Sequence, residues 1–185
     1  LIITGMSGAG KTQVVRTLED LNFFCIDNLP ATLIPKFAEL CRQTSEEKVA
    51  LVVDIRGGRF FDKLLQVLDE MEASGQKYEL LFLDASDATL LRRYKETRRR
   101  HPLGERNTLL KNITCERELL DPLREKATHI IDTSTLTTAQ LKAKVTEMFG
   151  EGSSKERMGI VVRSFGFKHG LPLDSDLVLD VRFLP

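Results

Sequence analysis

The feature that most constrains this chain is an eight-residue stretch near its start, Gly5-Met6-Ser7-Gly8-Ala9-Gly10-Lys11-Thr12. It fits the pattern G-x-x-x-x-G-K-[ST] at every fixed position, follows the apolar run 1–4 and precedes a helical pattern. In this setting the glycines let consecutive backbone N–H groups face one concavity, at the positive end of a helix, where phosphate oxygens bind. Lys11 would reach the β- and γ-phosphates, and the Thr12 hydroxyl would hold Mg²⁺. The alternative is a glycine loop with a structural role only.

Short apolar runs alternate with amphipathic segments along the first 150 residues. The expected strands are 1–4, 23–27, 49–54, 79–84 and 129–132. The expected helices are 11–21, 30–42, 60–73, 88–99, 106–127 and 138–149. This alternation predicts an α/β fold, a P-loop NTPase with a kinase-like, doubly wound parallel sheet. Ligands of such sheets bind at the carboxyl ends of the strands, where Asp27, Asp54, Asp84 and Asp132 fall.

A polar, small and charged stretch at 151–156 has the composition of a linker. We therefore expect a P-loop nucleotide-binding domain over 1–152. Residues 153–185 would be the linker and the truncated start of a second α/β domain, with strands over 158–163 and 177–183. The absence of an initiating Met and the abrupt end at Pro185 favour a fragment.

A P-loop needs a second acid for its Mg²⁺ shell, and Asp54, after the apolar run 49–53, is the best candidate. Asp54-Ile55-Arg56-Gly57 also has the form D-x-x-G, in which a glycine N–H can approach a γ-phosphate; the alternative is an Asp that starts a turn. Asp84 competes for the metal-shell role. The segment after it is better explained as a helix start, in which Ser86 or Asp87 caps the helix from residue 88.

The same choice between a cap and a ligand arises after the second strand. Asp27 or Asn28 would cap the helix that Pro30 opens, although the same loop would face the phosphate loop. No N-K-x-D motif for reading guanine is present.

The densest charge run lies at Arg92-Arg93-Tyr94-Lys95 and Arg98-Arg99-Arg100-His101. On a helix, Arg92, Lys95 and Arg99 would share one face and Arg93 and Arg100 another. Three interpretations stay open: a solvated helix face, a lid that clamps transferred phosphate, and an RNA-backbone patch. We assign no catalytic role to His101, His129 or His169, and we expect Cys25 to be a core residue.

Composition bears on the partners and the cellular compartment of the protein. Lys and Arg total 27, as do Asp and Glu, so no global charge draws the chain to nucleic acid or membrane. Three cysteines without metal spacing favour a reduced, cytoplasmic compartment. No apolar run approaches the ~20 residues that cross a bilayer, so we expect no membrane partner.

Several segments together resemble the RapZ/YvcJ family of bacterial nucleotide-binding proteins. They are G-M-S-G-A-G-K-T, F-F-C-I-D-N-L-P, V-V-D-I-R-G, R-R-R-H-P-L and V-R-S-F-G-F-K-H-G-L-P-L-D-S-D. The resemblance implies ATP binding at Gly5, Met6, Ser7, Gly8, Ala9, Gly10, Lys11 and Thr12. It implies GTP binding at Asp54, Ile55, Arg56 and Gly57, and slow hydrolysis. For part of the family it also implies RNA binding and an RNase-adapter role through the C-terminal domain, most of which lies beyond residue 185.

The sequence thus favours a regulatory nucleotide-binding protein with weak ATPase and GTPase activity. Lys11 and Asp54 would be catalytic, and Thr12 and Asp54 would hold Mg²⁺. A small-molecule or nucleotide kinase with an arginine-rich lid is the alternative, and an RNA or protein adapter can coexist with the first function. An oligomer is compatible with the sequence, which does not specify one.

Overall fold

The computed structural model describes residues 1–44, 48–53, 58–98, 100–104, 107–150, 162–171 and 175–180. The chain divides into two compact units, Leu1–Ser153 and Ser154–Pro185. Among the described residues, no helix combines the length and apolar character that crossing a membrane requires.

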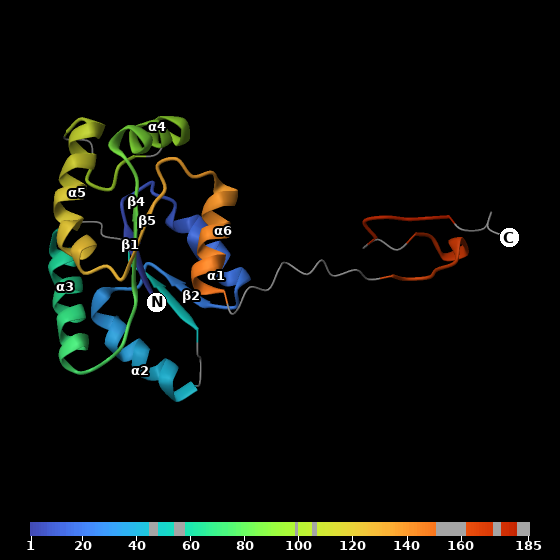
Figure 1. Ribbon diagram of the computed structural model, residues 1–185, viewed down its shortest axis with the longest axis horizontal. Helices are drawn as coiled ribbons and strands as arrows, with labels where there is room; N and C mark the ends of the chain where they lie inside the picture. Colours follow the sequence, from blue (N-terminus) through green and yellow to red (C-terminus); the bar gives the residue numbers. More distant parts are fainter. Residues whose placement is uncertain are drawn as a thin grey trace. The chain divides into compact units, whose positions relative to one another are not determined.

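Unit 1 is built on a single five-stranded sheet (Figure 1). Its strands are β1 (Ile2–Gly5), β2 (Phe24–Asp27), β3 (Val49–Val52), β4 (Leu80–Asp84) and β5 (His129–Asp132). Every pair of neighbours runs parallel, in the order β2-β3-β1-β4-β5. The predicted parallel α/β sheet is therefore confirmed.

Helices cover both faces of this sheet, as a parallel sheet requires. They are α1 (Lys11–Asp20), α2 (Ile34–Thr44), α3 (Gly58–Ala73), α4 (Asp87–Thr97), α5 (Leu109–Glu125) and α6 (Thr138–Phe149). Figure 1 shows α3 and α5 over one face, α1 and α6 over the other, and α4 across the carboxyl end of β4. The connection from β1 leads to β2 on one side, whereas that from β3 leads to β4 on the other. The switch point of the sheet therefore lies at the carboxyl ends of β1 and β3, where ligands of such folds bind.

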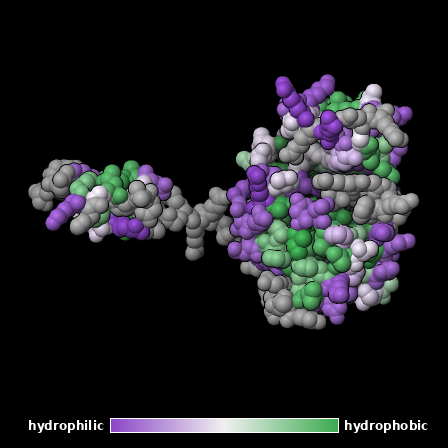
Figure 2. All heavy atoms as spheres, turned by 180° about the vertical axis from the view of Figure 1, so that it is seen from behind, coloured by the Kyte–Doolittle hydropathy of each residue, from purple (hydrophilic) through white to green (hydrophobic). Residues whose placement is uncertain are grey.

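The core lies along the central strands. Every residue of β1 is buried, and Ile3, Leu81 and Leu83 have no exposed surface. The outer strands are less covered: Phe24 of β2 is 53% exposed and stacks on Phe37 of α2 at 6.4 Å between ring centroids. Figure 2 shows apolar side chains among polar ones on the surface of unit 1.

Two predicted helices differ from the structure at their ends. Pro30 precedes a 3₁₀ turn over Ala31–Leu33 that has no side-chain cap, so the predicted cap from Asp27 or Asn28 is wrong. Asn28 instead takes a left-handed φ of 59°, which turns the chain before the helix begins. Helix α4 ends at Thr97 because Arg98 is left-handed, with φ 50°. Arg100 therefore lies beyond the helix, so the predicted shared face of Arg93 and Arg100 is wrong. Arg92 and Lys95 are both on α4, and Arg99, the third residue of the other predicted face, lies outside the described residues.

Unit 2 is described over 162–171 and 175–180, and its only regular element there is a 3₁₀ turn, η2 (Phe167–His169). The predicted strands are absent from the described residues 162–163 and 177–180; the remainder of both predictions lies outside them. Val162 is 90% exposed and Leu177 is 77% exposed. Without a partner that buries them, apolar segments of this length do not form stable strands.

Candidate functional site

The Gly5–Thr12 stretch forms a loop between the buried strand β1 and helix α1, as the motif predicts. Gly5 starts it with φ 135°, and a Cβ there would lie 2.1 Å from the Leu83 carbonyl oxygen, so only glycine fits against β4. Gly10 ends it as the N-cap of α1, with φ 103°. The positive end of the α1 dipole therefore faces the loop.

The N–H groups of this loop divide into two sets. Those of Met6 and Ala9 donate within the protein, to Leu83 (2.9 Å) and Met6 (3.0 Å) carbonyl oxygens. Those of Gly8, Gly10 and Thr12 donate to no backbone or side-chain acceptor in the described part of the chain. Such N–H groups at a helix start form an anion site, since their donors need an acceptor and the dipole favours negative charge.

Lys11 lies across the loop. Its Nζ donates to the Gly5 carbonyl oxygen at 2.7 Å and to that of Met6 at 3.2 Å. The Thr12 side chain on the first turn of α1 is exposed. The loop that carries the unpaired N–H groups thus also carries an ammonium group and an exposed hydroxyl-bearing side chain.

Arg93 of α4 holds the tip of the loop. Its Nη1 donates to the Gly8 carbonyl oxygen and to Thr133 Oγ1, both at 3.0 Å, and its Nη2 donates to the Thr133 carbonyl oxygen at 2.7 Å. Thr133 Oγ1 in turn donates to the Ala9 carbonyl oxygen at 2.9 Å. The guanidinium group therefore joins the loop to the segment after β5. The sequence showed Arg93 only as one of several arginines, and nothing local distinguishes it.

A hollow of about 200 Å³ adjoins this contact. It is lined by residues 8–10 of the loop, by Gln13, Arg93, Thr133 and Leu136, and by Leu141 of α6. An apolar side, backbone atoms and a planar cation together suit a flat heteroaromatic ring.

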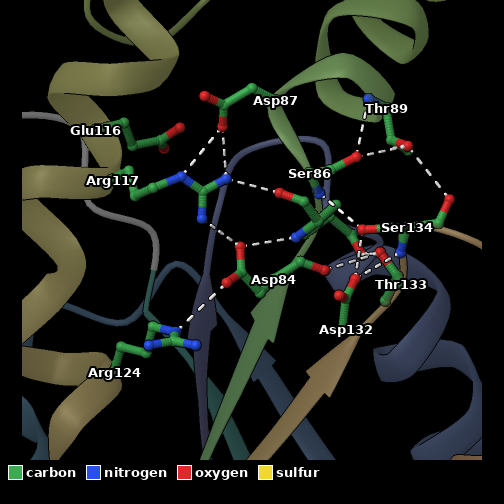
Figure 3. Close-up of polar contacts among 12 residues, drawn as sticks. Asp84, Ser86, Asp87, Thr89, Glu116, Arg117, Arg124, Asp132, Thr133 and Ser134 are labelled. Atoms are coloured by element: carbon green, nitrogen blue, oxygen red, sulfur yellow. Dashed lines mark hydrogen bonds and ion pairs between the residues drawn. The ribbon is translucent and has the colours of Figure 1, made fainter.

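Asp84, the acid at the end of β4, is paired with two arginine side chains of α5 (Figure 3). Asp84 accepts a hydrogen bond from Arg117 Nη1 at 2.7 Å and pairs with Arg124 Nε at 3.4 Å. Arg117 also donates to Asp87 and to the Ala85 carbonyl oxygen, each at 2.7 Å from its Nη2. Asp84 therefore anchors α5 to the sheet.

The predicted cap of the following helix is confirmed: Ser86 Oγ accepts from the Thr89 N–H and begins α4. Asp84 and Asp132 are register partners in β4 and β5, so two of the predicted acids do lie side by side. Hydrogen bonds from the Ser134 side chain and backbone hold the pKa of Asp132 below its usual value.

The predicted residues Asp54, Ile55, Arg56 and Gly57 lie outside the described residues. The Mg²⁺ role of Asp54 therefore stays a prediction. Among the residues that are described, no three His, Cys, Asp or Glu side chains gather as a metal site.

The remaining predictions concern single side chains. Cys25 is half-buried, and burial raises the pKa of its thiol to about 11. His129, on the edge strand β5, has its Nε2 3.0 Å from Glu79 Oε2. Arg92 is 65% exposed and faces Glu96, as the solvated-face interpretation of the basic run predicts for that residue.

These features define a P-loop protein with a kinase-like α/β fold. Solved structures share the fold: shikimate kinase from Bacteroides thetaiotaomicron has a TM-score of 0.52 and 22% identity, covering 80% of this chain and 94% of that one. Shikimate kinase from Acinetobacter baumannii, in complex with shikimate, has a TM-score of 0.55 and 21% identity, covering 80% and 90%. At such identities the likeness establishes the fold alone.

The family model of the RapZ-like N-terminal domain matches residues 1–153, and that of the RapZ C-terminal domain matches residues 158–185. The chain therefore belongs to the RapZ family, and the resemblance noted in its motifs is confirmed.

Relatives named nucleotide-binding protein support this membership. That of Clostridium botulinum strain Hall is 56% identical over 188 aligned positions, covering 100% of this chain and 64% of the relative. That of Desulforamulus reducens is 58% identical, covering 100% and 63%. The chain thus spans less than two-thirds of the length of these relatives.

Proposed function

We propose that unit 1 binds a nucleoside triphosphate, ATP or GTP, through the loop Gly5–Thr12. The observation that carries the proposal is the set of unpaired N–H groups at Gly8, Gly10 and Thr12, at the start of α1. Phosphate oxygens would accept from these groups, and the Lys11 ammonium would leave its carbonyl partners to face the β- and γ-phosphates. The relatives' name, nucleotide-binding protein, supports the same function.

The base of the nucleotide would occupy the 200 Å³ hollow beside the loop. Arg93 forms one wall of this hollow and Leu141 another, so a purine ring there would contact a guanidinium plane and an aliphatic side chain.

The Thr12 hydroxyl suits Mg²⁺, because it is an exposed oxygen ligand next to the anion site. Thr12 would hold the ion together with Asp54. When bound, the ion would neutralise charge on the β- and γ-phosphates.

We further propose that hydrolysis is slow. A fast hydrolase needs a group that orients the attacking water. Asp84 and Glu116, two carboxylates near the loop, already accept hydrogen bonds from Arg117 and Ser7 respectively. Neither is therefore placed to activate water, and turnover would depend on Lys11, Thr12 and Asp54.

Calorimetric titration of the protein with ATP and with GTP, each with and without Mg²⁺, tests this function. We expect both nucleotides to bind, more tightly with Mg²⁺, and to compete for one site. Absence of heat and of competition with either nucleotide would remove the proposal.

A small-molecule kinase is the second candidate, and the fold shared with two shikimate kinases supports it. Phosphate release without any acceptor would favour the hydrolase. ADP formation that depends on an added hydroxyl-bearing acceptor would favour the kinase.

We also propose, from the family, that the whole protein works in the cytoplasm as an adapter for RNA or an RNase through its C-terminal domain. Matching of residues 158–185 to the RapZ C-terminal domain supports this. Binding of RNA by the full-length protein should weaken linearly with salt on a log–log plot.

A further inference from the structure

A buried carboxylate holds the phosphate loop from outside its concavity. Glu116 Oε1, on α5, accepts from the Ser7 hydroxyl at 2.6 Å and from the Ser7 N–H at 3.2 Å. Its Oε2 lies 3.1 Å from His101 Nε2. Glu116 and His101 are each 6% exposed and Ser7 is 8% exposed, so this contact is closed to water.

The hydrogen bonds around His101 fix where its proton lies. The Leu103 N–H donates to His101 Nδ1 at 3.2 Å, so Nδ1 carries a lone pair. Nε2 therefore carries the hydrogen and donates a hydrogen bond to Glu116 Oε2. The Glu116 carboxylate thus accepts hydrogen bonds from three donors: the Ser7 N–H, the Ser7 O–H and the His101 Nε2–H.

A buried carboxylate is costly unless donors surround it, and this one is surrounded by donors from two separate segments. Ser7 lies inside the phosphate loop, and His101 belongs to the connection between α4 and α5. The His101 ring also contacts Tyr94 of α4, at 5.2 Å between centroids. Tyr94 in turn closes the space behind Gly8, where an added Cβ would lie 3.5 Å from its ring.

This arrangement sets the direction of the loop's N–H groups. Because the Ser7 N–H points to Glu116, it is withdrawn from the phosphate concavity, and the peptide before Ser7 is held in one orientation. Gly8, the next residue, keeps its N–H unpaired. Glycine at this position could otherwise rotate freely, since its φ of 86° is one of several open to it.

We propose that Glu116 is the positioning residue of the phosphate loop, and that His101 holds Glu116 in place. Glu116 does not touch the nucleotide. It keeps the loop in its binding shape before the nucleotide arrives, so that binding does not pay for ordering the loop. This inference rests on the proposed nucleotide-binding function.

The test compares Glu116→Gln and Ser7→Ala with Glu118→Gln, an exposed glutamate on the same helix, as the matched control. The first measurement is the Kd for ATP with Mg²⁺ by calorimetry. We expect Glu116→Gln to weaken binding about tenfold or more, because a charge-assisted hydrogen bond is lost. Ser7→Ala keeps the hydrogen bond from the residue 7 N–H to Glu116, so it should lose less affinity for ATP. The control, Glu118→Gln, should bind ATP as tightly as the parent does.

A second measurement separates positioning from general stability. In the nucleotide-free protein, the NMR amide signals of Gly8 and Gly10 should shift in Glu116→Gln and not in Glu118→Gln. The His101 Nε2–H should give a signal that exchanges slowly with water in the parent and disappears in Glu116→Gln.

The outcomes are distinguishable. Unchanged ATP affinity and unchanged glycine signals in Glu116→Gln overturn the inference. If that variant does not fold, Ser7→Ala decides: a smaller loss of ATP affinity is expected, and affinity and glycine signals both equal to those of Glu118→Gln overturn the inference. If the parent binds no triphosphate, the proposed function fails, while the glycine signals still decide whether Glu116 positions the loop.

Discussion

Arg93 on α4 donates to the carbonyl oxygen of Gly8 in the phosphate loop at 3.0 Å, across a sequence separation of 85 residues. The same guanidinium group also binds Thr133, beyond β5. One side chain therefore ties together three segments that border the proposed nucleotide site.

Replacing Arg93 should affect ligand binding and stability together. We expect Arg93→Ala to weaken ATP and GTP binding by roughly tenfold and to lower the free energy of unfolding by about 1–3 kcal/mol, because three charge-assisted hydrogen bonds are lost. Arg92→Ala, which removes a neighbouring guanidinium that is 65% exposed, is the control and should change neither. Calorimetry and urea denaturation measure the two effects. Equal behaviour of the two variants would contradict the role given to Arg93.

Lys11→Ala should abolish hydrolysis and weaken triphosphate binding, since Lys11 is the cation across the loop. Lys95→Ala, an exposed lysine on α4, is the matched control. Phosphate release measured with saturating ATP and Mg²⁺ checks this. A Lys11→Ala protein that turns over at the parent rate would show that the chemistry takes place elsewhere.

Substitution of Asp54 and of Asp84 should show which of these two acids holds Mg²⁺. Asp84→Asn should lower the free energy of unfolding by about 1–3 kcal/mol, because Arg117 and Arg124 lose a charged partner. Asp54→Asn should raise the Mg²⁺ concentration needed for half-maximal hydrolysis, as the proposed metal role of Asp54 requires. Titration of activity with Mg²⁺ in each variant measures this, and a shift in Asp84→Asn alone would reverse the assignment.

Gly5→Ala should destabilise unit 1 by roughly 3 kcal/mol or more, because the new Cβ would lie 2.1 Å from the Leu83 carbonyl oxygen. Gly75→Ala is a control for backbone strain alone: its φ is also positive, 70°, but nothing lies within 4 Å of the added atom. The free energy of unfolding of Gly75→Ala should fall by only about 1 kcal/mol. Thermal unfolding of both proteins gives the comparison, and similar losses would mean that the contact with β4 relaxes.

Alkaline pH should reveal the raised pKa of the half-buried Cys25 thiol. Desolvation, followed by the nearby Glu19, raises the pKa of Cys25 from 9.0 to about 11. In a Cys41→Ser, Cys115→Ser background, the rate of alkylation should therefore keep rising to about pH 11, whereas the urea-unfolded chain should level off near pH 9. Because the folded pKa is the higher one, stability falls as pH rises from 9 towards 11. A folded-state rate that levels off at pH 9 would contradict this.

The sequence was informative where local chemistry decides the structure. The apolar run, the glycine spacing and the helix after Lys11 indicated the phosphate loop, and Ser86 was identified as a cap because its hydroxyl needs only the N–H three residues ahead. The parallel sheet followed from the alternation of strands and helices. These features depend on neighbours within a few residues or on burial of whole segments.

The contacts that hold the loop could not be found in this way. Arg93 and Glu116 meet the loop across 85 and 109 residues of sequence, and each lies among similar charged residues. The helix expected to run to residue 99 ends at Thr97 because one residue, Arg98, turns left-handed, and Arg100 is therefore not on it. The strands expected in unit 2 are absent from the described residues 162–163 and 177–180, where Val162, Leu177 and Leu179 are largely exposed.

The central place of β1 bears on how this protein is made. Among the described strands β1 comes first along the chain, yet both of its neighbours, β3 and β4, follow it in the sequence and are translated later. β1 cannot be paired on both sides until β4, which ends at Asp84, has been synthesised, so the phosphate loop reaches its final structure late during synthesis. Slowing translation before residue 84 should therefore lengthen the period in which the nascent chain needs a chaperone.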